Sequence, residues 1–564
     1  MTDQPWLAHY DEGVPAKIDY KRLTLPEVLD RTVATYGDAP GVVFLNSTLS
    51  WRQLAAEVDR MAAAMAGLGV VKGDRVAVQL PNVPQGVIAF YAALRLGATV
   101  VMTNPLYTKR EVQHQWADSG CKLAVVMDFN WDEILRPNRA ELEPENYIVT
   151  SIPDYLRFPL NLLAPLKLKR QNPKRWAKVL PEPGVHSWKA LMKSAPAKPP
   201  EVKVEWDDLA VLQYTGGTTG PSKGAMLTHA NLVSNVQQID TWFTDVHYGK
   251  EVMMTALPLF HVFGLNVCMN WGIWAGTKLV LEPNPRDIPN LAKSIAKHKV
   301  TLFPAVPALF NNLTLVPGFD RTSAGTIRSC FSGSAPIADD VLQRFEALTG
   351  ARILEGFGMS ETSPVSHVNP LKGLRKIGCV GVPVSDTESR VVDMEAGETE
   401  MPMGEKGELV VRGPQVMQGY WEAPEATAST IRDGWMHTGD LATMDEDGFF
   451  RIVGRMKDMI NCSGMKVYPD ELDGVLISHP KILEAATIGI PCEKRGETVK
   501  SFIVMNTGET MTEQEVRDFC VENMARYKVP SDIEFMDELP KSSVMKILRR
   551  ELRDRELKQR GLQS

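Results

Sequence analysis

The sequence predicts an α/β protein, with a large N-terminal part built on parallel sheets and a small α+β domain at the C-terminal end. Strand and helix patterns alternate over 54–102, 209–281 and 300–354, which is typical of parallel sheets covered by helices. A chain of 564 residues is too long for one hydrophobic core. Near Gly454 the pattern changes, and the roughly 110 residues that follow are enough for one further domain.

The spacing of apolar residues predicts the individual elements. Leu54 to Leu68 has helical spacing, and RVAVQL at 75–80 predicts a strand. The segment 86–96 predicts a helix that ends at Gly97, and 98–102 predicts the next strand. The elements predicted for the small domain are a helix at 469–479, strands at 484–490 and 501–506, and a helix that begins with a capping box of Thr512 and Glu515.

The composition excludes several classes of protein. Hydrophobic residues make up 44% of the chain and charged residues 23%, which excludes global disorder. The net charge of −7 argues against a general nucleic-acid binder, because the phosphate backbone requires a basic face. The seven scattered cysteines, without a CxxC pair, predict reduced thiols in a cytoplasmic protein. The start of the chain lacks the pattern of a signal peptide, and no uncharged apolar run reaches the roughly 18–20 residues of a membrane span.

The segment 154–178 interrupts the α/β pattern. It combines Leu, Phe and Trp with seven Lys or Arg and three Pro. One interpretation is a surface excursion with a solvated basic face. The other is a patch that contacts a membrane peripherally, with apolar side chains among the lipids and basic ones at anionic headgroups.

The strongest local pattern for chemistry is the loop from Tyr214 to Gly224. Glycines among hydroxyl residues, ending in Lys223, suit a loop that surrounds phosphates with N–H groups and hydroxyls. A Walker A loop is excluded because Gly224, rather than Ser or Thr, follows the lysine. A Gly/Thr turn without function is the alternative, but the apolar strand before it favours a phosphate loop.

Further motifs follow in the order LPLFHVFGL (257–265), GSAP (333–336), EGFGMSETSP (355–364), DGWMHTGDL (433–441), GRMKD (454–458) and LPKSSVMK (539–546). Together with the loop, they resemble the adenylate-forming superfamily of acyl-CoA synthetases, luciferases and nonribosomal adenylation domains. The resemblance extends from Thr24 to Asp554. It implies an AMP-binding (adenylation) domain over 1–455 and a mobile C-terminal domain over 456–564 that carries the catalytic lysine.

The resemblance also assigns roles to residues. It places ATP against Thr215, Gly216, Gly217, Thr218, Thr219, Gly220, Lys223, Gly333, Ser334, Ala335, Glu355, Gly356, Phe357, Gly358, Ser360, Asp440 and Arg455. Among these, Phe357 stacks on adenine, Ser360 contacts the α-phosphate, and Asp440 suits the ribose hydroxyls. The residues implied in catalysis are Lys546, Glu361, His261, Thr215 and Lys223, with Mg²⁺ on Glu361 and the acyl carboxylate near His261. Lys457 matches the hinge between the domains, and Ser463 and Gly464 border the pantetheine tunnel.

These motifs imply an acid–CoA ligase that forms an acyl-adenylate from a carboxylate and ATP and then transfers the acyl group to CoA. The strings at 104–120, 413–421 and 546–554 look most like bacterial long-chain fatty acid–CoA ligases. Medium-chain or aromatic, cinnamate-type acids are the alternative substrates. The family usually has Gly where this chain has Met545, and this departure keeps open a nucleotide-binding regulator that has lost catalysis. A membrane-associated scaffold, a homodimer and a location at the inner face of the cell membrane also remain open.

Overall fold

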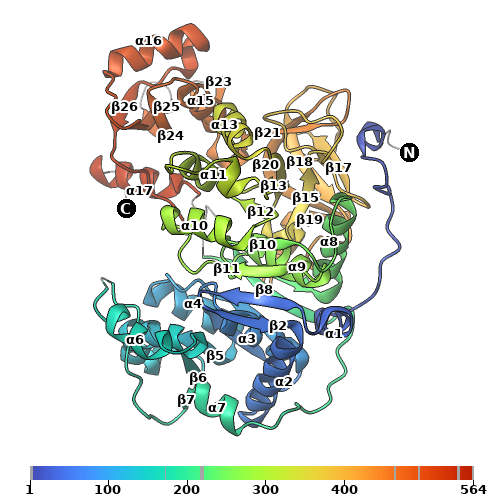
Figure 1. Cartoon of the computed structure of the whole chain (residues 1–564). Coiled ribbons are helices and arrows are strands. Elements are labelled where there is room, and N and C mark those ends of the chain that lie inside the picture. Colours follow the sequence, from blue (N-terminus) through green and yellow to red (C-terminus); the bar gives the residue numbers. More distant parts are fainter. Residues whose placement is uncertain are drawn as a thin grey trace.

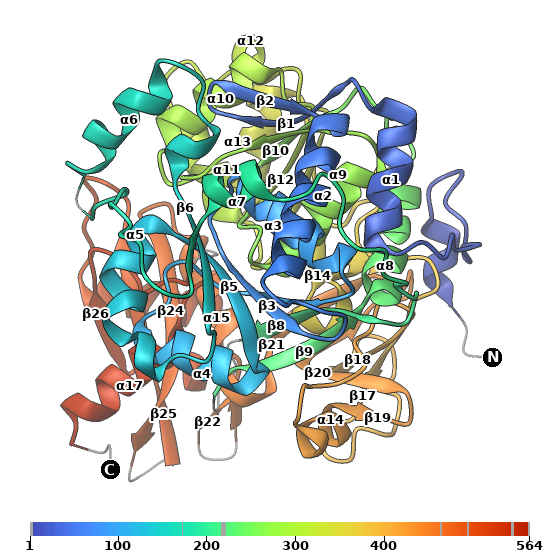
Figure 2. The same ribbon diagram turned by 90° about the horizontal axis from the view of Figure 1, so that it is seen from below.

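Two mostly parallel sheets form the body of the N-terminal part (Figures 1 and 2). The computed structural model describes residues 4–171, 173–215, 221–462, 465–492, 496–542 and 546–561. The larger sheet has the order β16 (Val382–Pro383), β15 (Val365–Val368), β14 (Arg352–Gly358), β13 (Ser329–Ser332), β12 (Leu302–Ala305), β10 (Val252–Thr255), β11 (Lys278–Leu281), β1 (Pro40–Phe44), β2 (Ser47–Ser50). The other has the order β7 (Val185–Ser187), β6 (Asn146–Thr150), β5 (Cys121–Met127), β3 (Arg75–Gln79), β4 (Thr99–Met102), β8 (Leu209–Thr215), β9 (Lys223–Thr228).

Antiparallel sheets follow toward the C-terminus. One has the order β17 (Glu388–Val392), β18 (Gly407–Arg412), β20 (Trp435–Met444), β19 (Ile431–Arg432), and β21 (Phe450–Arg455) also pairs with β20. The last has the order β23 (Met465–Val467), β22 (Ile460–Cys462), β25 (Gly496–Met505), β24 (Ile482–Cys492). In this last sheet, β26 (Asp532–Phe535) runs parallel to β25.

Helices cover these sheets and connect their strands. The α-helices of the N-terminal part are α1 (Leu25–Tyr36), α2 (Trp51–Gly67), α3 (Pro84–Arg95), α4 (Lys109–Ser119), α5 (Asp128–Asn130), α6 (Leu160–Leu168), α7 (Trp188–Ser194), α8 (His229–Trp242), α9 (Trp271–Trp274), α10 (Ile288–His298), α11 (Pro307–Thr314), α12 (Arg321–Ala324), α13 (Asp339–Thr349) and α14 (Pro424–Thr430). Those that follow are α15 (Pro469–Ile477), α16 (Glu513–Asn523) and α17 (Arg549–Gln559). The short 3₁₀ and π turns are η1 (Pro5–His9), η2 (Trp131–Leu135), η3 (Arg136–Glu141), η4 (Ile152–Tyr155), η5 (Phe263–Asn270), η6 (Ser360–Thr362), η7 (Met456–Asp458) and η8 (Arg526–Lys528).

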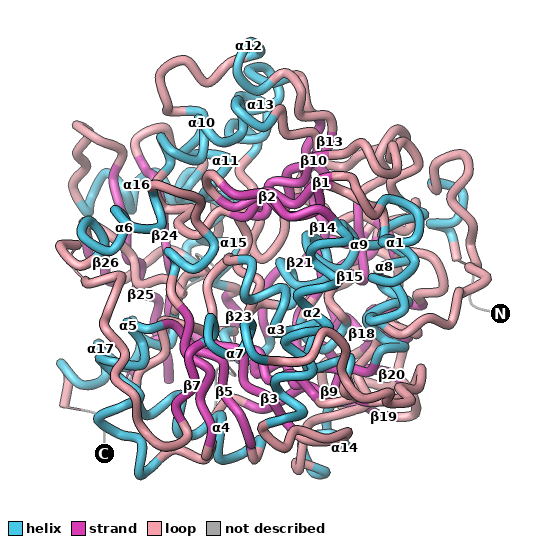
Figure 3. Tube along the Cα trace, turned by 60° about the horizontal axis from the view of Figure 1, so that its bottom comes forward, coloured by secondary structure: helices cyan, strands magenta, loops and turns pink. Residues whose placement is uncertain are grey.

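Helices α2 and α3 lie between the two parallel sheets (Figure 3). Every residue of α3 from Pro84 to Leu94 is buried, because β3 and β4 lie on one side of it and α2 on the other. A helix covered on all sides is apolar all round, which explains the long apolar run of the sequence. Arg95, which interrupts that run, forms a bidentate pair with Asp30 at 2.6 and 2.7 Å.

The structure confirms the predicted elements. The predicted helices at 54–68, 86–96 and 469–479 correspond to α2, α3 and α15. The capping box is present as well, since Thr512 Oγ1 accepts from the Glu515 N–H at 3.2 Å and the Glu515 carboxylate accepts from the Thr512 N–H at 2.7 Å. The mixed architecture with a small C-terminal sheet domain confirms the predicted fold class.

The small sheet has its own hydrophobic clusters on its two faces, and all their buried residues lie between Ile460 and Leu552. The large cluster of the N-terminal part ends at Phe450. These clusters are consistent with a division close to residue 455, and that boundary stays a prediction. No helix within the described ranges is both long enough and apolar enough to cross a membrane.

Candidate active site

The predicted phosphate loop connects two antiparallel neighbours, β8 and β9. Thr215, the last residue of β8, pairs in register with Lys223, the first residue of β9. The loop residues Gly216 to Gly220 lie outside the described residues. The Lys223 ammonium is exposed and lies 5.5 Å from the centre of the Tyr420 ring. The hairpin therefore places a lysine and a threonine at the two ends of the loop.

Glu361 lies beside this hairpin, on the short turn η6. Its carboxylate is buried, and Oε1 accepts a hydrogen bond of 2.7 Å from the Tyr420 hydroxyl. Burial raises the pKa of Glu361, while the hydrogen bond from Tyr420 and the positive charge of Arg455 oppose that shift. Tyr420 thus connects the lysine at the loop to the buried carboxylate.

Asp440 and Arg455 are direct neighbours on the paired strands β20 and β21. Arg455 Nε lies 2.9 Å from Asp440 Oδ1 in an ion pair. The other oxygen, Oδ2, is buried and has no hydrogen-bond partner among the described residues. Burial raises the pKa of Asp440, and the charges of Arg455 and Lys546 lower it. A buried acceptor without a donor is costly, so this oxygen is suited to a hydroxyl donor from a ligand.

Lys546 comes from the small domain but lies close to these residues of the large one. The residue as a whole is exposed, yet its ammonium is crowded enough by protein that desolvation lowers its pKa. The charge of Arg455 lowers the pKa further, whereas the carboxylate of Asp440 raises it. The structure therefore brings Lys546 within electrostatic reach of the Asp440–Arg455 pair.

A backbone turn and helix α17 hold Lys546 in place. The Ser542 N–H donates to the Lys546 carbonyl at 2.8 Å, and the Lys546 N–H donates to Ser542 Oγ at 3.2 Å. Arg549, three residues further on, contacts the carboxylates of Asp470 and Asp473, the latter at 2.5 Å. Met545 lies outside the described residues.

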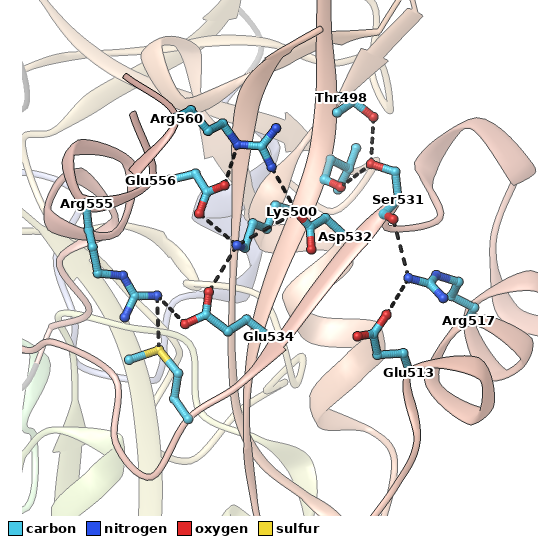
Figure 4. A network of polar contacts seen from close by, with 12 residues as sticks. Thr498, Lys500, Glu513, Arg517, Ser531, Asp532, Glu534, Arg555, Glu556 and Arg560 are labelled. Carbon is cyan, nitrogen blue, oxygen red and sulfur yellow. Dashed lines mark hydrogen bonds and ion pairs between the residues drawn. The ribbon is translucent and has the colours of Figure 1, made fainter. Parts of the chain in front are cut away.

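A buried charge network fixes the far end of α17 to the small sheet (Figure 4). Lys500 of β25 lies 2.7 Å from Glu556 of α17 and 3.0 Å from Glu534 of β26. Lys500 and Glu556 are both buried. Removing one partner of such a pair strongly destabilises the fold, because the other charge is then left buried and unpaired. The helix that follows Lys546 is thereby held at both of its ends.

His261 approaches the same place from the large domain, just before η5. Its Nδ1 accepts from the Phe263 N–H at 3.3 Å, so the neutral ring carries its proton on Nε2. Burial, together with the positive charge of Lys546, lowers the pKa of His261 to about 4. The imidazole is therefore neutral at physiological pH and offers Nε2–H as a donor.

Two segments that the resemblance places at ATP, 333–335 and 355–358, lie side by side at the ends of β13 and β14. Residues Gly333, Ser334 and Ala335 follow β13, and Ser334 adopts a left-handed backbone with φ of 73°. A Cβ atom on Gly333 would lie 3.8 Å from the Gly356 carbonyl, so the segments are in contact. The side chains of Ser334 and Ala335 are exposed.

Glu355 supports these segments from inside the protein. It is buried, and its carboxylate accepts from the Gly378 N–H at 3.0 Å and the Ile337 N–H at 3.5 Å. Burial raises the pKa of Glu355 to about 7. Phe357 is half-buried and pairs with His367 of β15, with ring centres 6.0 Å apart. These contacts show Glu355 holding backbone groups.

Gly358 is the last residue of β14, and Ser360 is the first residue of η6, directly before Glu361. A Cβ atom on Gly358 would lie 1.9 Å from the Pro364 carbonyl, so only glycine fits at that position. Ser360 is half-buried. Lys457 is exposed on η7, between the strands β21 and β22, and Ser463 and Gly464 lie outside the described residues.

A lysine of the large domain contacts the small one directly. Lys406, just before β18, lies 3.6 Å from the Glu471 carboxylate and 4.6 Å from the centre of the Tyr468 ring. Glu471 also binds Lys528 of the small domain at 2.5 Å. This contact contributes to the orientation in which Lys546 reaches Asp440.

Residues 29–421 match the AMP-binding enzyme family, and residues 471–546 match the C-terminal domain of AMP-binding enzymes. The chain belongs to the AMP-binding enzyme family. This finding confirms the resemblance to adenylate-forming enzymes.

Relatives of this AMP-binding enzyme match it over nearly its whole length. It is 39% identical to the long-chain-fatty-acid–CoA ligase of Bacillus subtilis (strain 168) over 559 residues, 99% of each chain. It is 41% identical to the long-chain-fatty-acid–CoA ligase of Escherichia coli O157:H7, over 97% of this chain and 98% of that one.

Solved structures of AMP-binding enzymes have the same fold. The anthranilate CoA ligase AuaEII in complex with anthranoyl-AMP has a TM-score of 0.84 at 25% identity, over 96% of this chain and 98% of that one. ATP-bound MatB from Rhodopseudomonas palustris has a TM-score of 0.81 at 29% identity, over 94% and 99%.

Sequence reasoning missed two residues that the structure connects to this site of the AMP-binding enzyme. Tyr420 lies in the string at 413–421, which was interpreted only as a sign of the substrate class. Its hydroxyl bonds to Glu361 across 59 positions of sequence. Lys406 lies in a polar turn that no local pattern distinguishes, and only the tertiary structure shows its contact with Glu471.

Proposed function

We propose that this protein is an ATP-dependent acid–CoA ligase that converts long-chain fatty acids to acyl-CoA through an acyl-adenylate. The observation that carries the proposal is similarity over nearly the full length to long-chain-fatty-acid–CoA ligases. The grouping of Asp440, Arg455, Lys546 and His261 around one place in the large domain supports it.

In the first step, a carboxylate oxygen of the acid attacks the α-phosphorus of ATP. The bond from that phosphorus to the bridging oxygen breaks, which gives acyl-adenylate and pyrophosphate. We assign the ribose hydroxyls to Oδ2 of Asp440, which has no hydrogen-bond partner within the described part of the chain and whose position Arg455 fixes. Lys546 would stabilise the negative charge that develops at the α-phosphate, and the neutral His261 would orient the acyl carboxylate.

The other nucleotide contacts remain our assignments. Thr215 and Lys223, at the ends of the phosphate loop, would hold the β- and γ-phosphates together with the loop residues 216–220. The segment 333–335 and Phe357 would hold adenine, and Ser360 the α-phosphate. Glu355 would act through the backbone groups that it fixes.

In the second step, the sulfur of CoA attacks the acyl carbonyl and loses its proton to the surroundings. The bond from the acyl carbon to the AMP oxygen breaks, which gives acyl-CoA and AMP. We assign to Lys457 the hinge about which the domain 456–564 turns between the steps, so that Lys546 leaves and CoA enters near 463–464. Such a movement allows one site to serve both reactions.

Mg²⁺ would neutralise phosphate charge when bound, and Glu361 is our candidate for its protein ligand. The buried carboxylate is a hard oxygen ligand, and Mg²⁺ typically binds one or two carboxylates plus phosphates and water. Among the described residues, no group of three or more His, Cys, Asp or Glu side chains is arranged to hold a metal ion. Phosphate oxygens and water would complete the shell around the ion. A homodimer and a peripheral location at the inner face of the cell membrane are further proposals.

An end-point thioester assay with Mg-ATP and CoA tests the function. The panel would contain saturated acids from short to long and a cinnamate-type acid, because a 4-coumarate–CoA ligase of Narcissus pseudonarcissus is 32% identical over 92% of this chain. We expect a long-chain optimum, and we expect Lys546→Ala to lose about 100-fold or more in adenylate formation. The matched control is Lys558→Ala, on the exposed side of α17.

Two outcomes would refute parts of the proposal. An optimum with the cinnamate-type acid would leave the chemistry intact but replace the substrate class. Absence of pyrophosphate release with every acid would favour the nucleotide-binding regulator and implicate Met545.

A further inference from the structure

Helix α6 stands apart from the hydrophobic core. None of its residues is buried, although its sequence, LNLLAPLKL, is mostly apolar. Phe158 just before the helix is 77% exposed, and Leu162 and Leu166 are 65% and 63% exposed. Leu160 and Leu163 are exposed as well. Soluble proteins expose single apolar side chains routinely, but a cluster on one short helix indicates an interaction surface.

The same segment concentrates positive charge. Its cations are Arg157, Lys167, Lys169, Arg170, Lys174, Arg175 and Lys178. None of the seven forms an ion pair with any acid that the structure describes. The acid of the segment, Asp154, is bound by Thr150, Ser151 and Lys189. The surplus of positive charge contrasts with the net charge of −7 for the whole chain.

Further exposed apolar and charged side chains lie near α6. The helix lies at the periphery of the molecule in two perpendicular views (Figures 1 and 2). A surface hollow next to η4 is lined by Lys189 and Lys193 of α7 and by the acids Glu57 and Asp154, so its charges are balanced and the surplus of positive charge lies on the α6 segment itself. Leu45, in the turn between β1 and β2, is also exposed, and the neighbouring Asn46 side chain bonds to the backbone of Arg157.

We propose that residues 157–171 and 173–178, with α6 at their centre, form a docking surface for a lipid bilayer with anionic headgroups. Phe158 and the leucines of α6 would enter the boundary between headgroups and acyl chains, while the cations contact lipid phosphates. A second copy of this chain fits less well, because two surfaces with the same surplus of positive charge would repel each other. A nucleic acid would contact the cations through its phosphates but would leave the exposed leucines in water.

This docking is independent of the reaction proposed above, since none of its residues belongs to the candidate active site. It would place the enzyme at the surface in which long-chain fatty acids dissolve.

Flotation with vesicles tests the proposal without any turnover. We expect the whole protein to bind vesicles rich in phosphatidylglycerol at low salt, to bind pure phosphatidylcholine weakly, and to dissociate as salt is raised. Each cation near an anionic surface contributes about fivefold, so the double substitution Lys167→Gln/Lys169→Gln should weaken binding about 25-fold. Leu162→Ser/Leu166→Ser should weaken it about tenfold or more.

The control variants remove groups of the same kind elsewhere: two cations in one variant and one leucine in the other. Lys293→Gln/Lys297→Gln removes two exposed cations from α10, and Leu315→Ser removes an exposed leucine. Both should bind as the unchanged protein does. Because the substituted side chains on α6 are unpacked, thermal unfolding should be unaffected, which separates lost docking from lost folding.

Several outcomes would overturn the proposal. These are no binding to anionic vesicles at low salt, equal binding to both lipids, or equal loss in the α6 and α10 variants. A change in sedimentation velocity of the α6 variants without a change in vesicle binding would instead identify the surface as a contact between copies or with a protein partner.

Discussion

Asp440 provides the sharpest test of the nucleotide site, through the substitution Asp440→Asn. The side chain is buried, with Oδ1 at 2.9 Å from Arg455 Nε and Oδ2 without a described partner. The amide can keep its oxygen toward Arg455 and then places an NH₂ group where Oδ2 was. A ribose hydroxyl would meet a donor in place of an ionised acceptor.

The expected rise in the KM for ATP follows from the loss of one hydrogen bond to Oδ2 of Asp440. A hydrogen bond to a charged acceptor contributes about 1.5–3 kcal/mol, or roughly 10- to 150-fold. A hydroxyl can rotate and accept from the amide, which recovers part of this, so we expect KM for ATP to rise about 10- to 30-fold. Binding of the ribose is the same in the ground and transition states, so kcat should change by less than about twofold.

A second readout follows from Lys546. Burial lowers the pKa of Lys546, and the negative charge of Asp440 opposes that shift. Removing the charge should lower the Lys546 pKa further. The alkaline limb of the adenylation pH profile should therefore move to lower pH, because the ammonium acts in its charged form.

ATP–pyrophosphate exchange at a fixed acid concentration measures both the KM for ATP and the pH profile of adenylation. The control is Asp433→Asn, which removes a carboxylate from the exposed turn between β19 and β20. Asn tolerates the left-handed backbone of that position, where φ is 48°. An ATP KM within about twofold of the unchanged enzyme, with an unmoved alkaline limb, would refute the ribose assignment for Oδ2.

Two further predictions concern residues behind the site. Tyr420→Phe removes the hydroxyl that donates to Glu361 at 2.7 Å, and should lower kcat/KM for Mg-ATP about tenfold, as measured by pyrophosphate release. For Glu355, the pKa in the folded state is about 7, above its ordinary value of 4.5. The folded state therefore holds a proton that the unfolded state has lost, and the free energy of unfolding should fall by up to about 3 kcal/mol between pH 4.5 and 7. Glu355→Gln, which keeps an oxygen for the backbone donors, should remove this contribution in chemical denaturation.

Matched comparisons decide both predictions. Tyr248→Phe removes a tyrosine hydroxyl that donates to Asp240 at 2.8 Å, on an exposed surface, and should leave kcat/KM unchanged. An equal loss in both tyrosine variants would contradict a specific role for Tyr420. An identical pH dependence in the Glu355→Gln variant and the unchanged protein would contradict the burial argument.

Local patterns were sufficient for the elements of the fold whose signals are themselves local. The capping box of α16 depends on two side chains three positions apart. The strand β3 lies within a parallel sheet, and its three central residues are apolar and buried, as is typical of such strands. Helix α3 was predictable as a helix, but the elements that cover it were not, because the local pattern does not show that α2 packs on one side of it and β3 and β4 on the other.

The candidate site was predictable only where a motif carries its residues. Asp440 and Arg455 lie in such motifs, and the sheet then pairs them directly. The resemblance places Glu355 at the nucleotide, which stays a prediction; the structure shows its buried carboxylate accepting from the N–H groups of Ile337 and Gly378. A motif fixes which residues approach one another, while the direction of each side chain depends on partners from other segments.

The position of Lys546 illustrates how such partners act together. Its own backbone turn, the Arg549 contacts with α15, and the Lys500 network fix it within the small domain. The contact of Lys406 with Glu471 then orients that domain toward Asp440. The Lys500–Glu556 and Arg549–Asp473 pairs of the first set are largely buried, whereas the Lys406–Glu471 contact is a partly exposed ion pair with an aromatic contact. Exposed pairs contribute at most about 1 kcal/mol, so this contact would oppose the proposed turn of the small domain only weakly.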